Sequence, residues 1–584
     1  MKLRLAVSAA VLAAIVSGQQ PQRRERPVRL TSRGMHGAVA GGTEYATEAG
    51  MRMYYHGGNA VDAGVATMLA ACVVEFSHFG LGGEAPILVR TKDGKVHAIA
   101  GVGTMPKMAT AQFFRDHKLT EEEIVSPPEA NGMKNWVPVA GILPALVPGM
   151  VEAALVTLRE YGTKSFAEIV QPAIELADGF PIDELRVISI TNSVKYLNAW
   201  PDSRRTFLPN GRVPQAGDIF RQADLARTLR GMAEAEKRAA AGGANRAKAI
   251  DAVHDYFYKG EIARRIDAFS KAHNGLLRYE DMAAFKLEPE EPVSTTFKGY
   301  TVYKGGFWSQ GPAMIEALKL AYADRDTYYG DPKFNRIPTE VLLSKEYAAE
   351  RRKLITDVAS LDFRPGKIGD KPPAHPFYAE IARHQIPDAL LAKDTTCVDA
   401  IDQDGVTFSA TPSGAWMPTY LAGDTGVALT QRAQSFLLVP GHPNELGPGK
   451  RPRVTLSPTL VTAPDKTVIA LSTPGGDNQD QSLMQVLFHS IFFGMNAQAA
   501  VEAQRFQTEH LVSSFDNHAM AAGSLLLDDR TAPNVIAELQ RRKHLVDLRT
   551  RYASGAAPVI IRLWPTGLIE AGADPYYYRS AQSW

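Results

Sequence analysis

The sequence predicts one mixed α/β body, and three observations support this fold class. The 584 residues are 45% hydrophobic and 22% charged, which is typical of a globular protein with a large core. Short strand segments and helical segments are interspersed along the chain from residue 37 to the C-terminus. A proline-studded strip at residues 361–393 lies in the middle of this pattern and reads as an accessible segment. Because no internal repeat is present, a single α/β body fits better than a string of domains.

The first 18 residues are typical of a secretory signal peptide. Lys2 and Arg4 precede an apolar run at residues 5–16, and small and polar residues follow it. The run is too short to cross a bilayer comfortably. A buried N-terminal helix is the alternative, but no helical periodicity continues into residues 21–24. We therefore expect an exported protein, periplasmic or secreted, whose mature chain has no transmembrane segment.

The next segment predicts a strand, two helices and a hairpin. A short strand is expected at residues 38–40, followed by a helix and a Gly-Gly-Asn turn at residues 57–59. A second helix at 60–74 is rich in Ala, Gly and Val, which favours close packing, and Asn59 would cap it. A strand at 86–90 then leads into a turn at Asp93-Gly94.

The rest of the chain divides into a helical part and a strand-rich part. Helices are expected over most of residues 148–287, with an exposed low-complexity insert at 239–244. Beyond Thr395 strands are expected to dominate through residue 438, and further strands at 459–461, 468–471 and 559–562. A helix is expected at 481–493.

Charge and motifs exclude several classes of function. The formal net charge of +1 gives no long-range field for nucleic acid or an anionic membrane. Neither a Walker loop, a His-Glu-x-x-His helix nor a Cys-x-x-Cys pair occurs in the sequence, so no cofactor and no metal are predicted. The run at 306–311 has one residue too many for a nucleophile elbow. A small-molecule partner is therefore expected.

The tripeptide Asp394-Thr395-Thr396 stands where the proline-studded strip gives way to strand sequence. A threonine hydroxyl is a poor nucleophile without a neighbouring base. If the chain is cut before Thr395, the new α-amine supplies that base. Taken alone, the tripeptide is more simply a strand start with a β-branched residue in its preferred place. Cys397 on the same strand has no flanking base and is expected to be a packing residue, like Cys72.

A second candidate element is the run of residues 471–477. A strand leads into Pro474-Gly475-Gly476 and then into a helix. Paired glycines at such a turn allow backbone N–H groups to converge on one point, which is the geometry of an oxyanion hole. A tight structural turn explains the pattern equally well on its own.

Taken together, these motifs resemble the γ-glutamyltranspeptidase family over most of the mature chain. The matching blocks, in order, are residues 57–67, 73–75, 80–83, 147–149, 394–396, 450–452, 457–459 and 474–476. The resemblance implies an N-terminal-nucleophile hydrolase with a four-layer αββα sandwich. It also implies a chain that cuts itself into a large subunit, residues 19–394, and a small subunit, residues 395–584, which form one body.

The resemblance also implies roles for individual residues. Thr395 would attack the Asp394 carbonyl to cut the chain and would then be the nucleophile toward a substrate amide. Ser413 resembles the hydroxyl residue that hydrogen-bonds the nucleophile. The N–H groups of Gly475 and Gly476 would hold the oxyanion. The acyl group would pass to water or to an amine or peptide acceptor.

Several positions depart from the family pattern. Typical members hold the glutamyl α-carboxylate with an arginine, but the corresponding run 101–106 contains none. A typical Ser-Ser pair is here Val454-Thr455. The asparagine beyond the hydroxyl residue becomes Ala415, and the acidic partner of the α-amine becomes Ser435. Ser435 and Thr455 therefore occupy substrate-binding positions with changed chemistry.

We expect a self-processing γ-glutamyl hydrolase or transferase that cleaves amides such as glutathione. Arg432 is a candidate replacement for the missing carboxylate contact, and a surface arginine is the competing interpretation. An acylase for glutaryl- or cephalosporin-type amides is the nearest alternative enzyme, because it would need no contact to an α-amine. A catalytically inactive binding relative is the alternative from another class.

Overall fold

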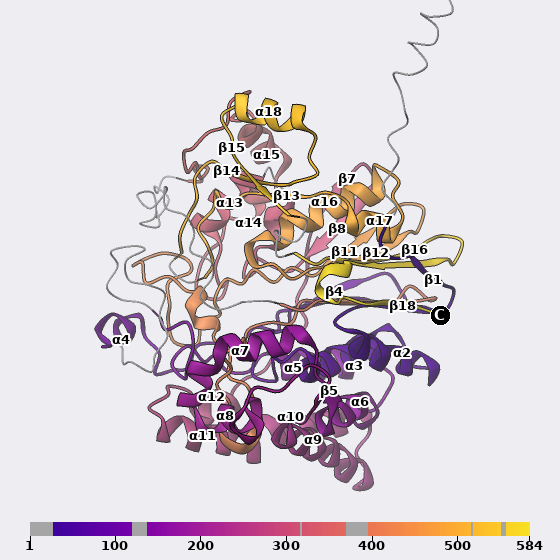
Figure 1. Ribbon diagram of the computed structural model, residues 1–584, viewed down its shortest axis with the longest axis vertical. Coiled ribbons are helices and arrows are strands. Elements are labelled where there is room, and N and C mark those ends of the chain that lie inside the picture. Colours follow the sequence, from indigo (N-terminus) through magenta and orange to yellow (C-terminus); the bar gives the residue numbers. More distant parts are fainter. Residues whose placement is uncertain (1–26, 119–136, 316–317, 370–394, 516–517, 551–555) are drawn as a thin grey trace, which may run out of the picture.

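Two antiparallel sheets pack face to face, and helices cover the outer face of each (Figure 1). This computed structural model describes residues 27–118, 137–315, 318–369, 395–515, 518–550 and 556–584. The expected signal peptide, most of the proline-studded strip and Asp394 lie outside the described residues. The arrangement of helix, sheet, sheet and helix confirms the predicted four-layer αββα sandwich.

The first sheet carries the strand that begins just after Thr395. Its six strands, in spatial order, are β18 (Ala581–Ser583), β2 (Gly37–Gly41), β9 (Val398–Asp402), β10 (Thr407–Ala410), β3 (Ile87–Arg90) and β4 (Val96–Ile99). The central pair, β9 and β10, is antiparallel, with Val398 opposite Ala410. The residues before β9 and those after β10 therefore lie at the same end of this strand pair.

The second sheet carries the strand that leads to the paired glycines. Its seven strands, in spatial order, are β1 (Ser32–Gly34), β17 (Ile569–Ala573), β16 (Val559–Leu563), β12 (Val468–Ser472), β11 (Thr459–Thr462), β8 (Tyr300–Lys304) and β7 (Val293–Phe297). Ser472 at the end of β12 donates a hydrogen bond of 2.9 Å to Asp399 of β9. This bond places the end of β12 directly across the sandwich from the start of β9.

Alternate residues of the strands face opposite layers, as the pleat requires. Cys397 and Ile401 lie in the apolar cluster between the two sheets. Val398 and Ala400, between them, pack against the helices on the outer face of the six-stranded sheet. Because both faces of β9 are covered, all five of its residues are buried, and the neighbouring Cys397 has the packing role expected for it.

The helical layer over the six-stranded sheet is built mainly from the N-terminal half of the chain. Its members are α2 (Glu44–Tyr55), α3 (Ala60–Val74), α5 (Met150–Tyr161), α6 (Phe166–Asp178), α7 (Glu184–Ala199), α8 (Pro201–Phe207), α9 (Ala223–Ala241), α10 (Arg246–His254), α11 (Glu261–Ala272) and α12 (Tyr279–Ala283). Every residue of α3 is buried, and Asn59 caps it by accepting bonds from the N–H groups of Val61 and Asp62. A Cβ on Gly64 would lie 2.2 Å from Phe408, so glycine permits this close approach to β10.

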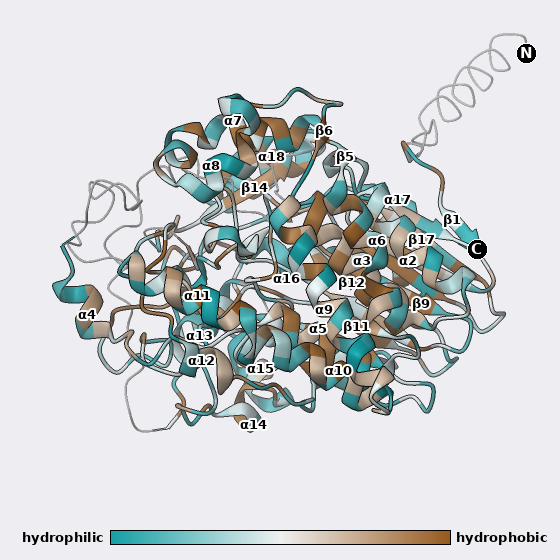
Figure 2. Cartoon of the chain, turned by 90° about the horizontal axis from the view of Figure 1, so that it is seen from below, coloured by the Kyte–Doolittle hydropathy of each residue, from teal (hydrophilic) through white to brown (hydrophobic). Residues whose placement is uncertain are grey.

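The opposite face is covered by helices from the middle and end of the chain. They are α13 (Leu318–Tyr328), α14 (Thr339–Leu342), α15 (Lys345–Arg352), α16 (Gln479–Ile491) and α17 (Ala497–Glu502). Smaller peripheral elements are α4 (Ala111–Asp116), α18 (Pro533–Arg541), β5 (Phe180–Pro181), β6 (Ile219–Phe220), β13 (Phe506–Gln507), β14 (Ser524–Asp528) and β15 (Leu545–Arg549). Hydrophobic residues concentrate on the central helices and strands, whereas α4 and α7 carry hydrophilic turns (Figure 2).

Three expectations about local structure need correction. Strands do not dominate through residue 438: after β10 the chain forms two short 3₁₀ helices, Gly423–Thr425 and Arg432–Ser435, before β11 begins. The helix expected at 481–493 begins and ends two residues earlier. The alanine-rich stretch at 239–244 is exposed, but its first half continues α9 instead of forming an insert.

The irregular segment after β10 is nevertheless buried. Pro412 and Pro418 cannot donate to a strand ladder, which disfavours a continued sheet. Side chains satisfy the backbone instead: the amide of Gln431 donates to the carbonyl oxygens of Trp416 and Pro418 at 2.8 and 2.9 Å. The segment therefore forms a rigid wall beside the edge where β9 begins. Among the described residues, no helix is long and apolar enough to cross a membrane.

Candidate active site

Thr395 and Ser413 lie close together at one end of the central strands β9 and β10 of the six-stranded sheet. Thr395 precedes β9 and is only 4% exposed, and Ser413 follows β10. Their hydroxyl oxygens lie 3.0 Å apart, within hydrogen-bonding distance. Ser413 is fixed in turn because its backbone exchanges two hydrogen bonds of 2.9 Å with that of Glu84. The structure thus brings the predicted nucleophile and the predicted hydroxyl partner together.

The paired glycines follow β12 of the seven-stranded sheet and lie at the same end of the sandwich. β12 ends at Ser472, whose bond to Asp399 places it beside the start of β9. Gly475 and Gly476 both have left-handed backbone conformations, with φ values of 117° and 53°. A Cβ at Gly476 would also lie 2.9 Å from the ring of Phe515. Both positions therefore favour glycine, and the turn lies directly before the start of α16.

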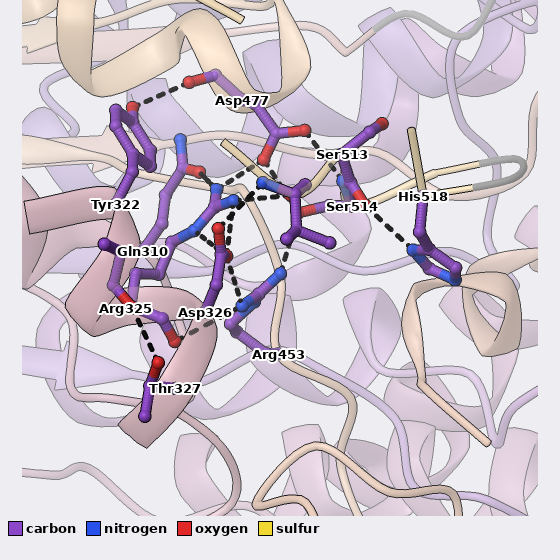
Figure 3. Close-up of polar contacts among 12 residues, drawn as sticks. Gln310, Tyr322, Arg325, Asp326, Thr327, Arg453, Asp477, Ser513, Ser514 and His518 are labelled. Carbon is purple, nitrogen blue, oxygen red and sulfur yellow. Dashed lines mark hydrogen bonds and ion pairs between the residues drawn. The ribbon is translucent and has the colours of Figure 1, made fainter. Parts of the chain in front are cut away.

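Buried polar side chains hold this turn from outside (Figure 3). The Gln310 amide donates to the Gly476 carbonyl at 3.3 Å, and the Tyr322 hydroxyl donates to the Asp477 carbonyl at 2.7 Å. The Asp477 carboxylate pairs with Arg325 of α13 and accepts bonds of 2.8 and 2.7 Å from the backbone N–H and hydroxyl of Ser514. The backbone carbonyls of Gly476 and Asp477 and the carboxylate of Asp477 are thus fixed by hydrogen bonds.

The charge of Asp477 depends on this network. Burial opposes its ionisation, but the neighbouring Arg325 guanidinium and the hydrogen bonds from Ser514 together lower the pKa of Asp477 below its ordinary value. The arginine partner of Asp477 lies 152 residues away in the sequence, so no local pattern indicated this pair.

A second ion pair, between Arg453 and Asp326, anchors the loop that contains Ser514. Arg453 donates to Asp326 at 2.9 Å and to the Ser514 hydroxyl at 3.3 Å, and Asp326 accepts a 2.8 Å bond from the Val512 N–H. The loop at 512–514 is therefore clamped between α13 and the segment before β11. Together with the Arg325–Asp477 pair, it forms a rigid support for the glycine turn.

Arg432 is fully buried beside the site, so the surface interpretation is wrong. Its Nε donates to Glu84 at 3.2 Å, and its guanidinium lies 4.5 Å from the ring centre of Trp416 and 5.7 Å from that of Phe515. Within the described residues, its Nη1 and Nη2 atoms have no hydrogen-bond partner. Phe515 also packs on Gly476, so the arginine lies one aromatic ring away from the glycine turn.

Glu84 contacts both Ser413 and Arg432. Its backbone holds Ser413, and its carboxylate accepts bonds from Arg432 and from the Thr430 hydroxyl. Burial raises the pKa of Glu84, although the Arg432 charge acts to lower it. Sequence reasoning did not single out Glu84; its position directly after the Gly80–Gly83 run was the available signal.

The other substrate-binding candidates are buried near this wall. Ser435 ends the 3₁₀ helix that Arg432 begins, and Thr455 lies in the segment before β11. In the part of the chain that the structure describes, neither hydroxyl oxygen has a hydrogen-bond partner. Ala415 is buried and offers no polar group. No group of three or more His, Cys, Asp or Glu side chains among the described residues is arranged to hold a metal ion.

Comparison with known proteins shows which family the chain resembles. The family model for gamma-glutamyltranspeptidase matches residues 46–315 and 312–584. The glutathione hydrolase proenzyme of Escherichia coli (strain K12) is 28% identical over 93% of this chain and 91% of its own. The acylase ACY 1 proenzyme of Pseudomonas sp. (strain SE83) is 28% identical over 92% of each chain.

A solved structure agrees with these sequence relatives. The cephalosporin acylase of Bacillus halodurans superposes with a TM-score of 0.79 and 28% identity, covering 97% of this chain and 99% of its own. The predicted resemblance and the predicted enzyme class, a γ-glutamyltransferase-like hydrolase of the N-terminal-nucleophile type, are confirmed. The chain belongs to the gamma-glutamyltranspeptidase family.

Proposed function

We propose that Thr395 is the nucleophile of a self-processing amidohydrolase that cleaves γ-glutamyl amides, glutathione among them. The observation that carries the proposal is the 3.0 Å contact between the hydroxyls of Thr395 and Ser413, opposite the left-handed turn at Gly475 and Gly476. In this proposal the hydroxyl of Ser413 orients that of Thr395, and the glycine N–H groups serve as donors to the developing oxyanion. The name of the Escherichia coli relative supports glutathione as a substrate.

Self-cleavage comes first. The Thr395 hydroxyl adds to the carbonyl carbon of Asp394, the C–N bond breaks, and the amide nitrogen takes a proton to become the α-amine of Thr395. An ester then joins Asp394 to the Thr395 oxygen, and water hydrolyses it to a carboxylic acid and a free hydroxyl. The products are residues up to 394 and residues 395–584, which stay together as a heterodimer because β9 and β2 are neighbours in one sheet.

Turnover then uses the new amine as the base. The amine takes the proton of the Thr395 hydroxyl as the oxygen attacks the substrate amide, and the N–H groups of Gly475 and Gly476 stabilise the oxyanion. The amine returns the proton to the leaving nitrogen, and an acyl-threonine ester remains. Water attacks this ester in hydrolysis, or an amine or peptide attacks it in transfer.

The wall beside the nucleophile supports recognition of a carboxylate. Among the described residues the two Nη atoms of Arg432 have no hydrogen-bond partner and form a bidentate edge, while its Nε donates to Glu84. We assign this edge to the carboxylate of the acyl donor, with the Ser435 and Thr455 hydroxyls as further contacts. A donor carboxylate would accept hydrogen bonds from two buried nitrogens for which the described part of the chain supplies no partner.

A second candidate activity is that of a glutaryl- or cephalosporin-type acylase. It is favoured by Ala415 and Ser435, which provide no negative charge for the α-ammonium of a γ-glutamyl group. The names of the two acylase relatives support it further. Both candidates share the nucleophile and the carboxylate contact and differ only in the group at the α-position.

The proposal is tested with three p-nitroanilides: γ-glutamyl, glutaryl and butyryl. Arg432→Ala is expected to raise KM for the two carboxylate-bearing donors about 10- to 100-fold, the effect of losing a charge-assisted hydrogen bond. Butyryl anilide, which has no carboxylate, serves as the internal control, and Arg541→Ala, at an exposed ion pair, is the matched variant. Unchanged KM for both acidic donors would remove Arg432 from the site. Faster glutaryl than γ-glutamyl turnover would select the acylase.

The proposal also includes export to the periplasm or the medium, which rests on the composition of residues 1–18. Cell fractionation followed by detection of the 395–584 subunit tests this point. Finding the processed protein only in the cytosol would contradict it.

A further inference from the structure

The segment that becomes a chain end after cleavage is held by an arginine from the opposite end of the protein. Arg579 lies in the C-terminal segment before β18 and is 1% exposed. Its Nη2 donates to the carbonyl oxygen of Thr395 at 3.0 Å, and its Nη1 donates to the Thr396 hydroxyl at 2.7 Å. This side chain therefore binds the backbone carbonyl of the residue assigned as the nucleophile.

Glu75, directly after α3, completes the anchor. Its Oε2 pairs with Arg579 and accepts a 2.6 Å bond from the Thr396 hydroxyl, and its Oε1 accepts a 2.9 Å bond from the Thr43 N–H. Burial opposes its ionisation, but the charge of Arg579 prevails and lowers the pKa of Glu75 far below its ordinary range. Glu75 and Arg579 are thus a buried, fully charged pair.

A chain terminus normally frays, yet catalysis requires that this one stay in place. The Thr396 N–H donates to the Pro412 carbonyl at 3.0 Å, in addition to the bonds from Arg579 and Glu75. These contacts come from three distant parts of the chain: the end of α3, the segment after β10 and the C-terminal segment. They fix the carbonyl of Thr395 independently of the peptide bond that cleavage removes.

The guanidinium also acts on the future amine through its charge. The amine and the carbonyl of Thr395 are attached to the same Cα, so a cation bonded to the carbonyl oxygen lies within a few ångströms of the amine. A nearby positive charge disfavours protonation, and the catalytic base must be unprotonated. Glu75 partly offsets this effect from the far side of the guanidinium.

Other charged and titratable groups surround the anchor. Nδ1 of His78 lies 3.2 Å from Glu75, and Arg186 lies 3.4 Å from the other ring nitrogen of His78. Glu84 and Arg432 form a pair behind Ser413. Asp399 faces the interior between the sheets, where burial raises its pKa and so favours its neutral form. Arg579 contacts the nucleophilic residue itself, through its carbonyl oxygen.

We propose that Arg579 is a positioning residue for Thr395, which holds the terminus created by cleavage and whose charge, tempered by Glu75, keeps the amine in its basic form. The proposal rests on the proposed function of Thr395. Arg579 contacts the carbonyl oxygen of Thr395 and the Thr396 hydroxyl, so it would act through the backbone and the amine of the nucleophile. Removing either member of the pair should therefore shift the pH at which activity is lost on the acid side, in opposite directions.

The test is the acidic limb of the pH profile of kcat/KM, measured on protein whose cut before Thr395 is verified by N-terminal sequencing. Arg579→Gln should move the limb about one unit toward higher pH, because Glu75 is then uncompensated. Glu75→Gln should move it toward lower pH. Arg579→Lys keeps the positive charge but loses the two Nη donors of the guanidinium. The acidic limb should therefore stay at the same pH, while kcat falls and KM is unchanged. A purely structural role would lower activity in all three without shifting the limb.

A measurement on the wild type covers the case in which the variants fail to fold or to be cut. A free α-amine ordinarily titrates at about 7.7–8.0. The wild-type limb is expected below that range, and a limb at or above it would overturn the proposal. Wild-type protein without a cut before Thr395 would instead overturn the function of Thr395, so the two failures are distinguishable.

Discussion

Asp477 offers a direct test of how the glycine turn is held. Replacing it with alanine removes the ion pair with Arg325 and both bonds from Ser514. Arg325 is fully buried, so it loses one of its two carboxylate partners but keeps Asp326 at 2.7 Å. Breaking a buried pair from one side costs about 3–5 kcal/mol, and the remaining partner places Asp477→Ala near the lower end, at about 3 kcal/mol.

The effect on catalysis should be separable from this loss of stability. The carboxylate anchors the residue that follows Gly476, so its loss frees the N–H donors to turn away from the oxyanion. Losing one such donor lowers kcat by about 100- to 1000-fold. Asp477→Asn keeps the size and one acceptor for Ser514 but lacks the charge, and we expect intermediate values of both quantities.

Stability is best measured by urea unfolding in a Thr395→Ala background, where the chain stays uncut and unfolding is unimolecular. Activity is measured in the cleaved protein with the same substitutions. Glu234→Ala, which removes an exposed ion pair with Lys237, is the control and should change neither quantity. If Asp477→Ala destabilised the protein but left kcat intact, the network would support the fold without positioning the oxyanion donors, and the reasoning would be refuted.

Two further perturbations probe the nucleophile and the support behind it. Ser413→Ala removes the hydroxyl 3.0 Å from that of Thr395, so kcat/KM should fall about tenfold and Ser413→Thr should restore it; equal activity of all three proteins would exclude Ser413 from the reaction. His442 is buried as a neutral ring, since it accepts a 2.9 Å bond from the Asn444 N–H and donates a 2.7 Å bond to the Asp326 carbonyl, and burial lowers the pKa of His442 to about 4. Its contribution to stability is therefore complete above the unfolded pKa of about 6.5 and is lost as the pH falls toward 4, a change of about 3 kcal/mol. Urea unfolding at pH 7 and 4.5 should show this loss in the Thr395→Ala background and a smaller one after His442→Gln; equal losses would contradict the assignment.

The parts of the fold that were predictable from sequence are those that local rules determine. The bounds of α3 were predicted because Asn59 caps it and apolar residues fill it without interruption. The strands β11, β12 and β16 were found within one residue at either end, because their apolar runs are bounded by turn residues.

The irregular wall after β10 was not predictable, because its order depends on distant partners. Its backbone is satisfied by side chains such as Gln431, and no periodicity reports such bonds. The same applies to the site. Thr395, Ser413 and the glycines were found from ordered motifs, whereas Arg325, Glu84 and Arg579 have meaning only through partners far along the chain.

The cut before Thr395 is the central claim, and denaturing electrophoresis with N-terminal sequencing tests it most directly. Two bands are expected for the wild type, the smaller beginning at Thr395, and one uncut band for Thr395→Ala. A single intact band for the wild type, indistinguishable from Thr395→Ala, would contradict it and leave Thr395 without a base.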